Sequence, residues 1–208
     1  KPQRRIAEAD LPPAAAKLDI LSNTIERLGE AGYQFIGMDH FAKPDDELAI
    51  AQREGKLHRN FQGYSTQAEC DLLAFGISSI GKVDDSYSQN VRTLDEYYAA
   101  LDANHLPVLR GLRLDQDDLL RRELIGELMC QFNLDTKRFA GQHQIDFQSY
   151  FKTEIEELKT LEKAGLLEWR EEEIYVPIKG RLLARRVAMT FDRHLRESQA
   201  KGTYSKVL

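Results

Sequence analysis

The chain has 208 residues, of which 42% are hydrophobic and 30% are charged, and its formal net charge is -5. A chain of this length and composition can bury one large core or two smaller ones, which excludes a disordered protein. The negative charge argues against wholesale phosphate binding, so we expect no nucleic-acid partner. No run approaches the roughly 20 apolar residues of a membrane span, and the sequence does not open on a signal pattern. We therefore expect a cytoplasmic protein with no membrane partner.

The chain has two cysteines, Cys70 and Cys130. They lack the close spacing that would let them hold one metal ion together, so we expect two free thiols and no metal ligand. The sequence begins at Lys1, inside a charged segment, and not at a methionine. We therefore expect the chain to be a fragment.

The first segment of the chain predicts a helix, a strand and a second helix. Apolar residues recur at three- and four-residue spacing over residues 14–30, which places them on one helical face, and Gly32 ends that helix. Residues 33–38 are rich in aromatic and branched side chains and predict a short strand. Acidic residues from Asp45 onward suit the start of the second helix, which Gly55 ends.

A second step of the same kind follows the polar loop after Gly55. Residues 72–80 are mostly apolar and precede Gly81, which predicts another parallel strand, buried on both faces. Thr93 and Glu96 have the spacing of a capping box at the start of a further helix. Alternating helices and buried strands indicate an α/β layer or barrel, although two strands cannot close one. We interpret residues 1–111 as the end of an α/β domain whose beginning is missing.

The pattern changes near residue 107, and we predict a second, mainly helical domain over residues 112–208. Its expected elements are a helix, another helix, a hairpin and a last helix: residues 115–132, 147–164, 166–176 and 177–195. This order resembles a winged-helix arrangement.

Candidate chemistry lies just after the predicted strands, because α/β barrels build their sites at the carboxyl ends of strands. His40 beside Asp39 could be a general base or a metal ligand, although a lone histidine is more often structural, by about two to one. His58, Arg59 and Gln62 could grip an anionic substrate, or they could be ordinary solvated groups of a polar loop.

The run YQFIGMDHFAKPDDELAIAQREGKLHRNFQGYSTQ, residues 33–67, resembles the oxygen-independent coproporphyrinogen III oxidases, a radical-SAM family. Further segments match the family in order: DLLAFGISSIG, VLRGLRLDQDDLLRRELIGELMCQFNLD and KGRLLARRVAM. The resemblance therefore spans nearly the whole chain. Relatives that handle heme usually carry an HN-x-x-YW motif in this region, whereas Asn60 leads into FQGYST without a tryptophan, which favours the oxidase.

The resemblance implies an enzyme that cleaves S-adenosylmethionine with a 4Fe-4S cluster held by a CxxxCxxC motif. Such an enzyme oxidatively decarboxylates two propionates of coproporphyrinogen III to vinyls, giving protoporphyrinogen IX in anaerobic heme biosynthesis. The implied fold is the last βα units of an incomplete radical-SAM, TIM-like barrel, followed by the winged-helix-like domain, in a monomer. Because the cluster motif is not in the sequence, we expect no catalytic residue in this chain and no turnover by it alone.

By the same resemblance, Ile80 contacts S-adenosylmethionine, while Phe61 and Gln62 lie at the rim of the active site. We expect Phe61 to pack and Gln62 to form hydrogen bonds. Arg59 or Lys43 could pair with substrate carboxylates, since a guanidinium can meet a carboxylate with two hydrogen bonds.

Two other functions compete with the oxidase. The parent protein could bind or deliver heme, or the last domain could bind DNA as winged helices often do. In that mode the helix before the wing would meet phosphate with no net attraction, because its four glutamates outnumber its three lysines. The last predicted helix carries six basic residues: Lys179, Arg181, Arg185, Arg186, Arg193 and Arg196. We interpret them as a face that is either solvated or docked against the missing domain.

Overall fold

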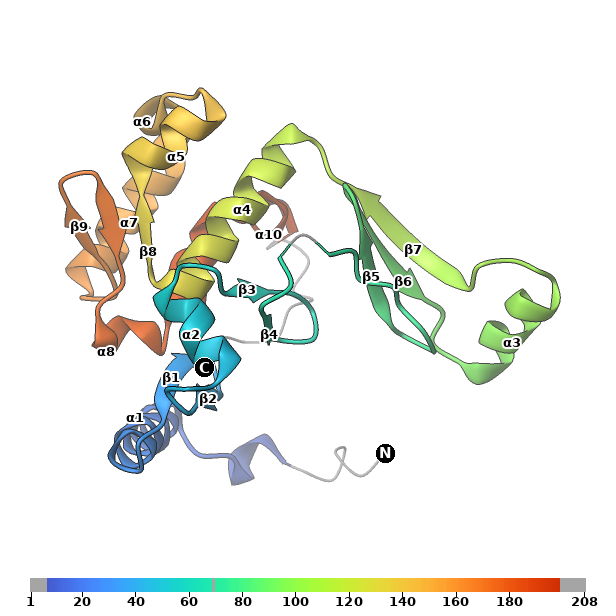
Figure 1. The fold of residues 1–208 in the computed structure, drawn as a ribbon, viewed down its shortest axis with the longest axis horizontal. Helices are drawn as coiled ribbons and strands as arrows, with labels where there is room; N and C mark the ends of the chain where they lie inside the picture. Colours follow the sequence, from blue (N-terminus) through green and yellow to red (C-terminus); the bar gives the residue numbers. More distant parts are fainter. Residues whose placement is uncertain (1–6, 69, 199–208) are drawn as a thin grey trace.

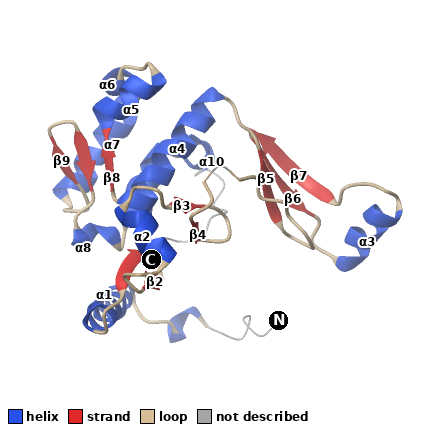
Figure 2. Ribbon diagram, in the orientation of Figure 1, coloured by secondary structure: helices blue, strands red, loops and turns tan. Residues whose placement is uncertain are grey.

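The computed structural model describes residues 7–68 and 70–198. Its helical elements are η2 (Glu8–Asp10), α1 (Ala14–Glu30), α2 (Glu47–Arg53), α3 (Leu94–Asp102), α4 (Gln116–Gln131), α5 (Thr136–His143), α6 (Phe147–Tyr150), α7 (Lys152–Lys163), α8 (Ile178–Arg181), α9 (Ala184–Ala188), η3 (Met189–Phe191) and α10 (Arg193–Ser198). Its strands are β1 (Gln34–Gly37), β2 (His40–Ala42), β3 (His58–Arg59), β4 (Tyr64–Ser65), β5 (Ile80–Val83), β6 (Ser86–Asn90), β7 (Val108–Arg113), β8 (Asn133–Asp135), β9 (Glu168–Arg170) and β10 (Glu173–Tyr175). The predicted mixture of helices and strands is confirmed (Figure 2). None of the described helices is long and apolar enough to cross a lipid bilayer.

The strands form four small sheets: β1-β2, β3-β4, β5-β6-β7 and β8-β10-β9. Every strand pair among the described residues is antiparallel, so the prediction of parallel strands is wrong. The apolar run 72–80 is mostly not a strand: Leu72 bridges to Lys82, while Leu73 and Phe75 are 66% and 82% exposed. An apolar run was mistaken for a buried strand because sequence alone does not show which face is covered. The described strands therefore give no support to the predicted βα units of a barrel.

The early helices and the long helix α4 agree with their predicted ranges. Asp46 caps α2 by accepting a hydrogen bond from the Leu48 amide at 2.9 Å. At the start of α4, Asp115 and Asp118 form a reciprocal capping box, which satisfies amides that have no partner within the helix. These local bonds explain why the beginnings of α2 and α4 could be predicted from sequence.

Two apolar clusters form the core. The larger one joins α4 to α5, α7, α9 and the β8-β10-β9 sheet, with Phe132, Phe139, Phe151 and Phe191 at its centre. The smaller one lies beneath β1, β2 and α2 and includes Ile36, Leu57 and Cys130. Because Cys130 belongs to α4, this helix packs against both parts of the chain (Figure 1).

The β5-β6-β7 sheet and α3 lie apart from both clusters. Figure 1 shows them at one side of the molecule, where β7 leads into the start of α4. Each residue of β7 is exposed, and the described residues 70–113 contribute no side chain to either cluster. The sheet is therefore held mainly by its own backbone hydrogen bonds.

The predicted continuous helix over residues 177–195 is wrong, because this segment is divided into α8, α9, η3 and α10. The break follows Gly180, whose backbone packs so closely that a Cβ atom there would lie 2.3 Å from the Leu166 carbonyl oxygen. The chain turns at Leu183, and the shorter helices then bury Val187 and Phe191 in the larger cluster.

Ion pairs hold α10 against α4. The Arg193 guanidinium lies 2.6 Å from an oxygen of Asp115 and 2.9 Å from oxygens of Asp117 and Asp118. Arg193 thus has three acidic partners within the protein, rather than standing on a solvated basic face.

A second set of ion pairs centres on Glu154 of α7, which is 3% exposed. Its Oε1 atom lies 2.8 Å from Nη1 of Arg121 and 3.0 Å from Nη1 of Arg196. Burial raises the pKa of Glu154, but the hydrogen bonds from the two guanidinium groups outweigh it and hold the pKa below its usual range. The pairs join α4, α7 and α10 around one carboxylate.

Candidate functional site

The turn between β3 and β4 carries two of the predicted site residues, Phe61 and Gln62. The Asn60 amide donates to the Gly63 carbonyl oxygen at 2.9 Å, and the Gln62 amide donates to the Asn60 side-chain oxygen at 2.8 Å. Gly63 has φ +140°, a conformation that L side chains rarely adopt. The tight turn leaves Phe61 53% exposed and Gln62 exposed. Both side chains are therefore available to a partner or ligand.

Tyr64 fixes this turn to the body of the protein. Its hydroxyl donates to the Met129 carbonyl oxygen of α4 at 3.1 Å. The same hydroxyl lies so close to Gly37 of β1 that a Cβ atom there would be 2.1 Å from the oxygen. Burial raises the pKa of Tyr64, with a smaller contribution from Cys130. The phenol therefore stays protonated at neutral pH and remains a hydrogen-bond donor.

His40 packs beneath the turn. Its Nδ1 atom lies 2.8 Å from Oδ1 of Asp39, without the alignment of a hydrogen bond. Its ring meets Tyr64 edge-on at 5.1 Å between centroids, and its Nε2 atom lies 3.1 Å from where a Cβ of Gly63 would be. These contacts give His40 a packing role.

Arg59 and Lys43, the two candidates for pairing with substrate carboxylates, have different surroundings. Lys43 Nζ donates to the Ala31 carbonyl oxygen at 2.9 Å and lies 3.9 Å from the centroid of the Tyr33 ring. The exposed Arg59 guanidinium lies 5.5 Å from the centroid of the Tyr64 ring. Arg59 is the better placed of the two for an anion at the turn, because the ammonium group of Lys43 is already engaged at the end of α1.

Phe61 packs against the face of the β5-β6-β7 sheet to which Ile80 belongs. Phe61 meets Tyr87 of β6 edge-on, with centroids 5.2 Å apart. Tyr87 and Gln89 are two positions apart in one strand and so share a face. Ile80 is paired with Gln89, and paired residues of an antiparallel sheet point to the same side. The structure thus places Phe61 on the sheet face to which Ile80 belongs.

Sequence reasoning missed Tyr64, Tyr87 and Gly37. Asn60 and Gly63 do give a turn signal that places Phe61 and Gln62 at a tip. No local pattern, in contrast, indicates that Tyr87 meets Phe61 or that Gly37 must accommodate a phenol, since both contacts join segments distant in sequence.

The two thiols do not fit an iron-sulfur cluster. Cys70 is exposed, whereas Cys130 is buried in the smaller core cluster, and burial raises the pKa of Cys130 to about 12. A cluster needs several thiolates close together. Residues 7–68 and 70–198 contain no group of three His, Cys, Asp or Glu side chains that could hold a metal ion.

Residues 114–183 match the family description "HemN C-terminal domain". The chain thus contains a segment similar to a HemN C-terminal domain. It is also 49% identical to the oxygen-independent coproporphyrinogen III oxidase of Salmonella typhimurium over 206 residues, which are 99% of this chain and 45% of that protein. The proteins of the same name from Escherichia coli K12 and Thermostichus vulcanus are 48% and 46% identical, each over 99% of this chain and over 45% and 63% of their own length.

The fold of the chain is similar to that of coproporphyrinogen III oxidase (HemN) from Escherichia coli, described as a radical SAM enzyme. The TM-score is 0.86 at 50% identity, and the match covers 93% of this chain and 44% of that one. The predicted resemblance to oxygen-independent coproporphyrinogen III oxidases is therefore confirmed. The chain spans about half the length of most of the curated relatives it matches.

Proposed function

We propose that the chain supplies the C-terminal portion of a coproporphyrinogen dehydrogenase. The proposed reaction is the oxidative decarboxylation of two propionates of coproporphyrinogen III to vinyl groups. The observation that carries this proposal is the 49% identity over 99% of the chain, together with the TM-score of 0.86 to a radical SAM enzyme. Such close similarity supports a shared reaction better than fold alone would.

In this proposal the β3-β4 turn and the β5-β6-β7 sheet contribute to the rim of the active site. Phe61 and Ile80 offer apolar surface on one sheet face. Ile80 is proposed to contact S-adenosylmethionine through this surface. The exposed Gln62 amide offers both a donor and an acceptor. S-adenosylmethionine supplies the radical chemistry when it is bound beside a 4Fe-4S cluster. The thiolates of that cluster would come from outside this chain, which has two cysteines.

Arg59 is proposed to pair with a carboxylate of the substrate. It is exposed beside the turn, and the ring of Tyr64 beneath it directs the guanidinium without neutralising its charge. A guanidinium can meet a propionate carboxylate with two parallel hydrogen bonds, which fixes orientation as well as binding.

Residues 112–208 are proposed to form a separate winged-helix-like domain, after residues 1–111, that shields the active site from water. The order α4, β8, α5, α7, β9, β10 supports the winged-helix comparison. A DNA-binding role gains little support, because Arg193 and Arg196 are engaged with carboxylates of α4 and α7. A cytoplasmic monomer remains our expectation.

A chimera tests the proposed function. In this chimera, the chain replaces the matching region of the Escherichia coli oxidase. The rest of the Escherichia coli protein would supply the iron-sulfur cluster. We expect the anaerobically reconstituted chimera to form vinyl groups from coproporphyrinogen III, followed by mass spectrometry. A folded, cluster-loaded chimera that binds heme but forms no vinyl group would favour the heme-handling alternative instead.

A further inference from the structure

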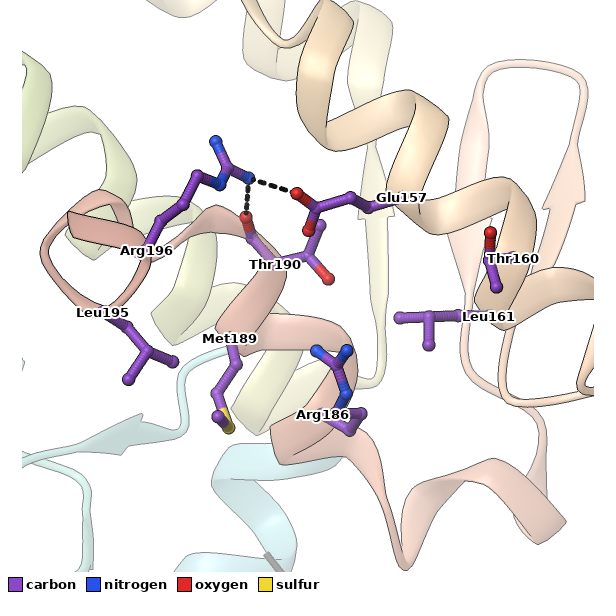
Figure 3. A pocket seen from close by; sticks show the side chains of 8 residues that line it. All are labelled: Glu157, Thr160, Leu161, Arg186, Met189, Thr190, Leu195 and Arg196. Carbon is purple, nitrogen blue, oxygen red and sulfur yellow. Dashed lines mark hydrogen bonds and ion pairs between the residues drawn. The ribbon is translucent and has the colours of Figure 1, made fainter. Parts of the chain in front are cut away.

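A cavity of about 300 Å³ lies between α7 and the segment formed by α9, η3 and α10 (Figure 3). None of the residues that line it belongs to the candidate site around Phe61. Its wall combines charged, hydroxyl and apolar side chains, and its volume is near the lower end of the range for small-molecule sites. The cavity is thus a feature that the proposed oxidase function does not use.

A buried hydroxyl without a partner points into this cavity. Thr190 is 2% exposed, and its Oγ1 atom has no hydrogen-bond partner within the part of the chain that the structure describes. Figure 3 shows the hydroxyl directed toward the space between Leu161 and Arg186. Because a buried hydroxyl is costly when it is unpaired, an acceptor bound in the cavity would remove that penalty.

The cavity also has one positive charge in excess. Arg196 is already satisfied: it lies 3.2 Å from Glu157, 3.0 Å from Glu154, and donates to the Thr190 carbonyl oxygen at 2.9 Å. Arg186 takes part in none of the ion pairs found among the described residues, and its guanidinium points toward the cavity in Figure 3. The charged residues of the wall are Arg186, Arg196 and Glu157, so the wall carries a net charge of +1.

Apolar side chains complete the wall and restrict the ligand. Leu161 and Leu195 are each 9% exposed, and Met189 lies beside them. A ligand that matches this wall carries a single negative charge, accepts hydrogen bonds from a planar guanidinium and a hydroxyl, and has a short apolar tail. Phosphate fits less well, because it brings more charge and no apolar group.

We propose that this cavity binds a small aliphatic carboxylate, with its carboxylate between Arg186 and Thr190 and its chain against Leu161 and Met189. Binding uses one charge-assisted contact and one neutral hydrogen bond, so millimolar affinity is expected for a ligand of a few carbon atoms. The proposal is independent of the oxidase function.

The test is a titration of the 208-residue chain with sodium propionate at constant ionic strength, followed by NMR of the methyl groups of methionine, leucine and threonine. We expect saturable shifts at Met189, Thr190 and Leu161. R186Q should weaken binding at least tenfold, whereas R185Q, which removes the exposed neighbouring charge outside the cavity, should leave it unchanged.

Substitutions at Thr190 separate ligand binding from folding. T190V should weaken propionate binding at least threefold without lowering the thermal midpoint, since a methyl replaces a hydroxyl that has no partner. T190S keeps the hydroxyl and should retain binding. Tighter binding of phosphate than of propionate would overturn the proposal. So would shifts that do not saturate, or equal losses in R186Q and R185Q, because these outcomes indicate an adventitious ion only.

Discussion

Phe61 meets Tyr87 edge-on with ring centroids 5.2 Å apart, and this contact joins the β3-β4 turn to the sheet that contains Ile80. Aromatic pairs of this geometry contribute about 0.5–1.5 kcal/mol beyond the area they bury. Because Phe61 is half exposed, a double-mutant cycle of Phe61→Ala and Tyr87→Ala should give a coupling energy of about 0.5 kcal/mol in urea unfolding.

The control cycle pairs Phe61→Ala with Tyr98→Ala, since Tyr98 is an exposed tyrosine that contacts Tyr97 on α3. Its coupling energy should be zero. Equal coupling in the two cycles would mean that the Phe61 contact does not join the turn to the sheet.

Gln62→Ala in the chimera should lower kcat/KM about tenfold, the value of a lost hydrogen bond of about 1.4 kcal/mol at the reacting complex. The side chain is exposed, so the free energy of unfolding should not change. The matched control is Gln148→Ala on α6, another exposed glutamine, which should leave kcat/KM unchanged. If both variants retain full activity, Gln62 is not a residue of the site.

Gly37→Ala should destabilise the chain by about 2 kcal/mol or more, measured by urea unfolding. Gly37 has φ +152°, and the added Cβ would lie 2.1 Å from the hydroxyl oxygen of Tyr64. Gly29→Ala is the opposite case, because Gly29 lies within α1 with nothing within 4 Å of an added Cβ. That change should stabilise the chain by about 0.5–1 kcal/mol. Destabilisation by both changes in equal amount would show that the Tyr64 contact is not responsible.

Glu154→Gln should lower stability at neutral pH by about 3 kcal/mol, because it leaves Arg121 and Arg196 without a buried charged partner. The pKa of Glu154 is lower in the folded than in the unfolded chain. Its stabilising contribution is therefore complete above the unfolded pKa of about 4.3 and is lost as the pH falls through the lower, folded value.

Urea unfolding at a series of pH values between 7 and 3 measures this contribution. The unmodified chain should lose more stability on acidification than the Glu154→Gln variant, so the two curves should converge. Glu156→Gln serves as the control, because Glu156 is exposed and pairs with Lys159 on the helix surface. That variant should change stability by less than about 1 kcal/mol.

The two cysteines should differ in reactivity toward a thiol reagent at neutral pH. Cys70 is exposed and should be modified promptly, whereas Cys130 is buried and burial raises its pKa to about 12, so almost no thiolate forms. Peptide mapping after brief labelling should therefore find Cys70 alone, and Cys130 only after unfolding in urea. Equal labelling in the native state would mean that the smaller core cluster opens readily.

The helices were predictable because their signals are local. The capping residues Asp46 and Asp115 bond to amides two or three positions away, and the apolar spacing of α1 is visible in the sequence. The hairpin formed by β9 and β10 was also predictable, because a charged turn separates two short segments that contain apolar residues.

The sheets were not predictable in the same way. β6 has the sequence SYSQN and no apolar alternation, so nothing local indicates that it is the central strand between β5 and β7. The candidate site residues Phe61 and Gln62 were named from the family resemblance alone, whereas the contacts of Tyr64 and Tyr87 depend on segments far apart in sequence. The pairing of Arg193 with Asp115 at the start of α4 joins residues 78 positions apart and has no sequence signature.

Helix α4 is bonded to different neighbours at its two ends. Near its start, the Leu114 amide donates to the Asp85 carbonyl oxygen at 2.7 Å, next to the sheet that carries Ile80. Near its end, the Met129 carbonyl oxygen accepts the hydroxyl of Tyr64 beneath the Phe61 turn. Sixteen helical residues measure about 24 Å, and such a rod neither stretches nor shortens appreciably. The length of α4 therefore sets the distance between the two segments bonded at its ends. An insertion of a single helical turn within α4 would change the distance between Ile80 and Phe61, although neither residue is substituted.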